Sequence, residues 1–136
     1  MCMYNDSLYR ISLKCLIRNS EGEVLVVKEV NRESWDLPGG GMNHGEDLMT
    51  SIRRELKEEI NFDGSFTYKI LALDEPIHLL TRDVWQVRVV LEIQPDSMNF
   101  SVGADADDVR FMNPDSFGQS EHEMEQKIYE YTNRYF

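Results

Sequence analysis

Alternation of apolar and polar residues predicts several β-strands in this chain. The pattern is clearest in residues 9–18 and 85–93, where every second residue is apolar, as is typical of half-buried strands with one solvated face. Turn-forming residues at 19–22 join the first of these to an apolar run at 24–27, which predicts a hairpin. Further strands are predicted at 65–73, 77–80 and 109–112, and 95–106 reads as an irregular acidic region with one short strand around Phe100.

Two other segments have the three- and four-residue spacing of an amphipathic helix. One covers residues 48–60, and the other lies near the end of the chain with Met124, Ile128, Tyr131 and Tyr135 on one face. Asn113 before Pro114, and Ser120 three residues before Glu123, are typical helix-start signals. Strands followed by a helix, more strands and a terminal helix indicate a mixed α/β protein, and 136 residues suit one domain, 1–136.

Composition narrows the class of protein. Hydrophobic residues make up 41% and charged residues 29%, which is ordinary for a soluble globular domain. No apolar run approaches ~18 residues, so no membrane span is expected, and the N-terminus lacks the pattern of a signal peptide. The cysteines, Cys2 and Cys15, form neither a CxxC pair nor a disulfide framework. A reducing, cytoplasmic location is therefore expected.

The net charge of −11 bears on possible partners. A protein that binds duplex nucleic acid would need a basic surface, so this class of partner is not expected. An acidic protein can still act on an anionic small molecule if divalent cations are bound, because such ions become the largest local charges. Solubility alone explains the charge equally well. The sequence is compatible with a monomer or a homodimer.

Carboxylates gather on the helix predicted at 48–60. Glu55 and Glu59 are four residues apart and Glu58 is three from Glu55, so all three share one helix surface. Like charges at this spacing repel each other unless a cation lies among them. Carboxylate oxygens are hard ligands that suit Mg²⁺ or Mn²⁺. The alternative is an acidic, solvated helix in a protein that binds no metal.

A glycine-rich turn precedes this helix, and together they resemble the Nudix box, G-x5-E-x7-R-E-U-x-E-E-x-G-U, where U is a bulky apolar residue. Asn61 stands where the second glycine is expected. That position commonly needs left-handed backbone, and Asn is the next-best residue for it. The run Trp35–Gly40 looks like the usual lead-in to the box. The positions that match the motif are Gly40, Glu46, Arg54, Glu55, Leu56, Glu58, Glu59 and Phe62.

The resemblance implies a Nudix-type α/β/α sandwich around a mixed, largely antiparallel sheet. It also implies Mg²⁺-dependent hydrolysis of a diphosphate linkage in a nucleoside diphosphate derivative, with nucleoside triphosphates included and Mn²⁺ able to substitute. Glu55, Glu58 and Glu59 would bind the metal, Gly39 would add its carbonyl oxygen, and Arg54 would orient the glutamates. The resemblance also implies that a carboxylate downstream of the box acts as a further metal ligand or as the general base, with a solvated acidic loop as the alternative. The candidates are Asp105, Asp107 and Asp108.

The substrate is less defined by the sequence. Lys28, at the end of its strand, and Arg88, with Gln86 on the polar face of the strand at 85–93, are candidates for substrate contacts. The alternative for Lys28 is a solvated lysine at the end of a strand. The alternative for Arg88 and Gln86 is a solvated strand face, which is what we expect for residues 85–93. His44 lies within the box and is a further candidate for touching the substrate. A nucleotide-binding regulator that uses a Nudix domain without turnover is the alternative function.

Overall fold

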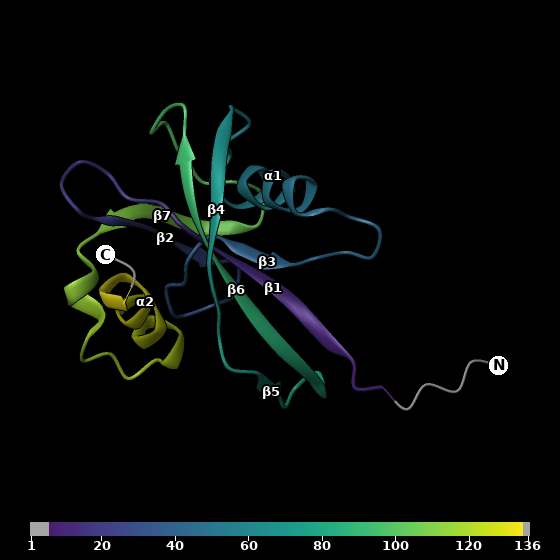
Figure 1. The fold of residues 1–136 in the computed structure, drawn as a ribbon. Helices are drawn as coiled ribbons and strands as arrows, with labels where there is room; N and C mark the ends of the chain where they lie inside the picture. Colours follow the sequence, from purple (N-terminus) through teal and green to yellow (C-terminus); the bar gives the residue numbers. More distant parts are fainter. Residues whose placement is uncertain (1–5, 135–136) are drawn as a thin grey trace.

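Figure 1 shows the fold in a computed structural model, which describes residues 6–134; Cys2 and Tyr135, named above, lie outside them. The longest strand covers the alternating segment around residues 85–93, and the first helix covers the segment predicted at 48–60. In chain order the elements are β1 (Tyr9–Leu16), β2 (Val24–Glu29), β3 (Gly39–Gly41), α1 (Leu48–Ile60), β4 (Phe66–Leu73), β5 (Ile77–Leu79), β6 (Val84–Pro95), β7 (Ala106–Met112), the 3₁₀ helix η1 (Pro114–Phe117) and α2 (Glu123–Arg134).

The strands form two sheets. The larger has the order β3-β1-β6-β4, with β5 also paired to β6, and the smaller contains β2 and β7. Strands β1 and β6 run parallel, and the other pairs are antiparallel. The predicted mixed, largely antiparallel sheet is therefore confirmed.

The predicted hairpin between the first two strands is wrong as a sheet pairing. An antiparallel bridge joins Arg18 to Val24, and the Leu25 amide donates to the Ile17 carbonyl across the turn. Beyond that point β1 joins β3 and β6, whereas β2 pairs with β7. The turn residues identify the reversal of the chain, but they do not determine which partner each strand takes farther along.

Two apolar cores lie on opposite sides of the strands. Leu25 and Val27 of β2 face the core that contains Ile52, Leu56 and Ile60 of α1. The alternate residues of the same strand, Val24 and Val26, face the core that contains Ile128 and Tyr131 of α2. Figure 1 accordingly shows α1 and α2 on opposite sides of the strands. Because both faces of the central strands are covered, the predicted α/β/α sandwich is confirmed.

Helix α1 is capped at both ends, and its left-handed C-terminal residue is the one that the sequence predicts. Asp47 is the N-cap and accepts a hydrogen bond from the Thr50 amide. Asn61 is the C-cap in the left-handed region, with φ 53° and ψ 38°, at the position where the motif has glycine. Its side chain accepts from Lys57 Nζ and donates to Ser101 Oγ. These contacts hold the segment after Phe100 against the C-terminal end of α1.

The expectation of a solvated polar face on β1 and β6 is wrong. Ser12, Lys14, Gln86 and Arg88 are all buried, with at most 5% of their surface exposed, whereas Ile11 on the apolar face is 43% exposed. The alternation itself is present, but loops and α2 cover part of the polar face. This buried polar face forms one wall of a pocket described below.

Two smaller expectations also differ from the structure. No strand forms around Phe100, which packs between Phe62 and Phe111 instead. Asn113 and Pro114 begin η1 as a cap and first residue. Ser120 accepts from the His122 amide and donates to Glu125, so it does not form the reciprocal capping box with Glu123.

Candidate active site

Carboxylates from separate parts of the chain meet in one open cleft of about 450 Å³. Glu55, Glu58 and Glu59 reach it from α1, and the glycines of β3 form the facing wall. The remaining lining residues include Glu29 at the end of β2, Asp105 before β7, and the cations Arg10 and Arg54. The cleft is therefore strongly acidic.

Glu59 is the most deeply buried of these acids, with 3% of its surface exposed. Its Oε1 accepts a 2.6 Å hydrogen bond from the Gly39 amide. Burial raises the pKa of Glu59 to about 9, and the nearby Glu29 carboxyl contributes in the same direction. Among residues 6–134, no cationic side chain forms an ion pair with Glu59. The charge of Lys14 and the Gly39 amide favour the charged form of Glu59, but burial outweighs them.

Glu55 is held between a cation and a glycine. Arg54 Nη1 lies 2.8 Å from its Oε1, but burial still raises the pKa of Glu55 above its ordinary value. A Cβ atom on Gly40 would lie 2.6 Å from Glu55 Oε1, so only glycine lets the carboxylate approach β3 this closely. This contact is a physical reason for the glycine at the start of the motif.

Arg54 connects the turn before α1 to the glutamates on α1. Its guanidinium donates to both carboxylate oxygens of Glu46 at 2.8 and 2.9 Å, and to the Gly41 carbonyl at 3.0 Å. It also contacts Glu55 at 2.8 Å and Glu58 at 3.3 Å. The hydrogen bonds from Arg54 lower the pKa of Glu46 to about 2. Arg54 is thus placed to restrict the side chains around it.

The donor set of the cleft fits a divalent cation. No three His, Cys, Asp or Glu side chains within residues 6–134 converge in metal-binding geometry. Arg54 and the Gly39 amide hydrogen-bond to Glu55 and Glu59. Yet hard oxygen donors are gathered there, and the buried Glu59 has no ion-pair partner among the described residues. Glu55, Glu58 and Glu59 would hold the ion.

A second, basic pocket of about 230 Å³ adjoins the acidic cleft and shares Arg10, Glu29 and Gly40 with it. In its wall Asp36 lies between Lys14 Nζ and Arg88 Nη2, each at 2.9 Å. Burial alone would raise the pKa of Asp36, but the charges of its two partners hold that pKa below its ordinary value. This buried ion-pair network explains why polar residues of β1 and β6 are covered.

The predicted site residues fall into two groups. Gly39, Arg54, Glu55, Glu58, Glu59 and Asp105 all line the acidic cleft, and Gln86 and Arg88 line the basic pocket. The others line neither. Lys28 lies opposite Asp108 in the β2–β7 ladder and over the Trp35 ring. Asp108 pairs with Arg110, Asp107 is exposed, and His44 lies in a separate hollow beside Tyr9.

Sequence reasoning missed several residues that line these cavities. Glu29 follows Lys28 at the end of β2, and its position before the loop to the box is a signal that would have identified it. Arg10 lies within the strand predicted at residues 9–18, and Arg82 lies in the turn between β5 and β6. Asp36 precedes the Leu37–Gly41 run and has no signal of its own, because its partners are 22 and 52 residues away.

Comparison with known proteins agrees with this geometry. A family model for the NUDIX domain matches residues 8–135. The RNA pyrophosphohydrolase of Edwardsiella ictaluri is 39% identical over 70 residues, and the match covers 52% of this chain and 39% of that protein. The RNA pyrophosphohydrolase of Ruthia magnifica is 38% identical over 58 residues, covering 43% of this chain and 32% of that protein. The matches thus span well under half the length of these curated relatives.

Solved structures show the same fold. The MutT protein from Methanosarcina mazei Go1 has a TM-score of 0.76 at 22% identity, covering 96% of this chain and 97% of that one. The dihydroneopterin triphosphate pyrophosphohydrolase of E. coli has a TM-score of 0.69 at 14% identity, covering 94% and 99%. At these identities the likeness concerns the fold.

The fold and the acidic cleft define a protein of the Nudix class. Because the family model spans nearly the whole chain, this protein belongs to the NUDIX domain family, as the motif predicted. The curated relatives reported above are named RNA pyrophosphohydrolase, the class of enzyme that the motif predicted for this chain. Neither helix within residues 6–134 has the length and apolar character needed to cross a membrane.

Proposed function

We propose that this chain hydrolyses a diphosphate linkage in a nucleoside diphosphate derivative, with nucleoside triphosphates included, and that residues 1–136 act as one domain. Mg²⁺, or Mn²⁺ in its place, would be bound by Glu55, Glu58 and Glu59, with the Gly39 carbonyl and Asp105 as further donors. Support comes from the shared cleft and from relatives named RNA pyrophosphohydrolase.

One observation carries the proposal most directly. Glu59 is buried next to other carboxyl groups, its pKa is raised to about 9, and no basic side chain of residues 6–134 pairs with it. Burying a carboxylate without a partner is costly, so an unpaired acid at this depth favours a cation ligand over a structural role. A solvated acidic helix would not bury Glu59.

Each residue then has a defined part. A divalent cation in the cleft would neutralise phosphate charge and lower the pKa of a bound water. The Gly39 amide fixes one oxygen of Glu59, and Arg54 fixes Glu55 and Glu58. Gly40 leaves room for the Glu55 carboxylate. The candidates for the general base are Glu55, Glu58 and a downstream aspartate.

A hydrolysis screen tests this function. Wild type and Glu59→Gln would be assayed with Mg²⁺ or Mn²⁺ at about pH 7.5–9, where a metal-bound water with a pKa near 7 is ionised. The panel would contain canonical and oxidised nucleoside triphosphates, triphosphorylated RNA, ADP-ribose, nucleotide sugars and dinucleoside polyphosphates. Turnover of one class that the variant loses is the expected result. Metal binding without turnover of any compound would favour a nucleotide-binding regulator, and no metal binding would refute both.

A further inference from the structure

The basic pocket beside the acidic cleft has a charge that the proposed reaction does not use. Its walls carry Arg10, Lys14, Arg32, Arg82 and Arg88 against the acids Glu29 and Asp36. This excess of positive charge occurs in a chain whose net charge is −11. A concentrated patch of the minority charge is a feature that typically attracts an anion.

Some of these cations already have partners. Lys14 and Arg88 share Asp36, and Arg32 lies 3.9 Å from Glu29 with its side chain largely exposed. Arg10 and Arg82 differ from these, because neither forms an ion pair with any acid in residues 6–134. Arg10 Nη1 donates instead to the neutral amide of Gln86. These two guanidinium groups therefore remain available to an anionic ligand.

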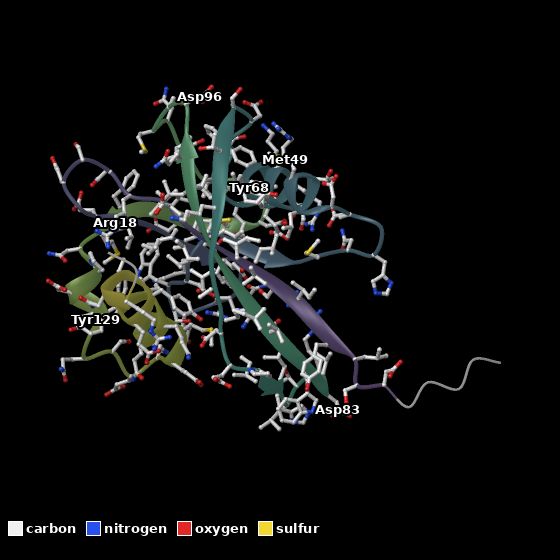
Figure 2. The ribbon with its side chains drawn as sticks, in the orientation of Figure 1. Arg18, Met49, Tyr68, Asp83, Asp96 and Tyr129 are labelled. Carbon is white, nitrogen blue, oxygen red and sulfur yellow. The ribbon has the colours of Figure 1, made fainter. Side chains whose placement is uncertain are left out.

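The positions of Arg10 and Arg82 make them neighbours. Arg10 is on β1 opposite Gln86 of β6, and Arg82 lies in the turn that leads into β6. Asp83, labelled in Figure 2, marks this turn at the end of β6 far from α1. Burial lowers the pKa of Arg10 and the positive charge of Arg82 lowers it further, whereas the charges of Glu55 and Glu29 act in the opposite direction. An anion placed between the two would remove this repulsion.

Arg88 adds a buried cation to the same wall. Its side chain is 4% exposed, and its Nε and Nη1 atoms are buried without a hydrogen-bond partner in the described chain. Asp36 neutralises one positive charge, but Lys14 and Arg88 both contact it. The inner end of the pocket therefore keeps a positive character.

The lining also argues against a nucleobase in this pocket. Within the described residues, the side chains that line it include no Phe, Tyr, Trp or His. Protein sites that hold bases commonly stack them on aromatic rings. Guanidinium groups suit phosphate oxygens, which they bind through paired N–H donors.

We infer that Arg10 and Arg82 bind a second phosphate group of the substrate, separate from the diphosphate that is cut in the acidic cleft. The inference rests on the proposed function for the position of the cut linkage. Arg10 borders both cavities, so one molecule can place its diphosphate against Glu55 and its additional phosphate against Arg82. The favoured substrates are diphosphate compounds that carry another phosphate elsewhere on the molecule.

Matched substrate pairs test this directly. Coenzyme A and 3′-dephospho-coenzyme A differ by one phosphate, as do ADP-ribose 2′-phosphate and ADP-ribose. For at least one pair, wild type should have a kcat/KM about tenfold or more higher for the phosphorylated member, as expected for charged hydrogen bonds. Arg82→Gln should bring this ratio close to one. Arg53→Gln, on α1 and outside both cavities, is the control that should leave the ratio unchanged.

Equal rates within both pairs for wild type would overturn the inference. So would an equal loss on both members in Arg82→Gln, because that result would place Arg82 on the cut diphosphate. Since Arg82 is exposed in a turn, its replacement should not prevent folding.

A binding experiment decides the matter even if no compound is hydrolysed. Inorganic phosphate would be titrated into metal-free protein at constant ionic strength, and the thermal midpoint recorded. Wild type and Arg53→Gln should be stabilised, whereas the double variant Arg10→Gln/Arg82→Gln should lose most of the shift. Phosphate binding without hydrolysis would preserve the subsite and reject the proposed reaction. Equal stabilisation of wild type and the double variant would overturn the subsite.

Discussion

Replacing Glu59 by glutamine should stabilise the metal-free protein. The Glu59 carboxyl is buried with a pKa of about 9, so at neutral pH the folded chain keeps a proton there that the unfolded chain releases. Glutamine has the shape of the protonated acid and can accept the same hydrogen bond from the Gly39 amide. The glutamine variant therefore avoids the free-energy cost of binding a proton at residue 59 on folding.

The size of the effect follows from the two pKa values. An unfolded glutamate titrates near 4.3, and each unit of pH between that value and the folded pKa is worth about 1.4 kcal/mol. At about pH 7.5 the wild-type cost is therefore on the order of 4 kcal/mol, an upper bound for the gain in Glu59→Gln. The folded state binds more protons than the unfolded state across this window. Wild-type stability should accordingly fall as the pH rises from about 4.3 towards 9.

Urea unfolding in EDTA at several pH values measures this. Glu59→Gln should show a higher midpoint than wild type at about pH 7.5 and a shallower fall with pH, while Glu121→Gln, an exposed matched control, should follow wild type. Added Mg²⁺ should raise the wild-type midpoint and have little effect on Glu59→Gln. A variant no more stable than wild type in EDTA, with the same pH slope, would refute this view of Glu59.

Three further changes have defined outcomes. Asp36→Asn leaves the buried cations Lys14 and Arg88 facing each other, so the free energy of unfolding in urea should fall by about 3–5 kcal/mol. A fall of less than about 1 kcal/mol would contradict the ion-pair network. Gly39→Ala should lower the free energy of unfolding by about 3 kcal/mol or more, because the φ of Gly39 is +146° and a Cβ atom there would lie 1.9 Å from the Leu13 carbonyl oxygen. Gly22→Ala, which places its Cβ in open space at φ +78°, should lower it less, and thermal melts of the two variants measure the difference. Asn61→Ala should lower stability by about 1–2 kcal/mol and Asn61→Gly should be close to neutral, as judged by denaturation midpoints; equal losses in both would show that the side-chain contacts, not the left-handed backbone, decide this position.

Local signals predicted the first helix and its surroundings well. The spacing of Ile52, Leu56 and Ile60 is an interaction within one helix, and Asn61 reports its own backbone conformation, so neither depends on distant partners. The family and the sandwich fold followed from the same short stretch. Helix spacing, cap residues and the motif can all be read from a short continuous segment of the sequence.

Distant pairings could not be predicted in this way. Nothing in residues 9–27 shows that β1 pairs with β6 while β2 pairs with β7, because the alternation of the first strand and the apolar run of the second predict strands without identifying their partners. The buried charges of Lys14 and Arg88 look like a solvated face until Asp36 is brought between them. For the same reason Arg10 and Arg82 were not recognised as neighbours, since their proximity depends on how β5 and β6 fold back.

The parallel pairing of β1 with β6 affects how the chain must assemble. Arg10 and Gln86, which face each other in this ladder, are 76 residues apart, so the centre of the larger sheet requires closure of a long loop. Such non-local contacts slow folding relative to helical proteins of the same size. During synthesis on a ribosome β1 would wait for β6 to emerge, and β3, which supplies the glycines opposite α1, has β1 as its partner among the described strands. The acidic cleft would therefore be among the last parts of the molecule to form, although most of its residues are made early.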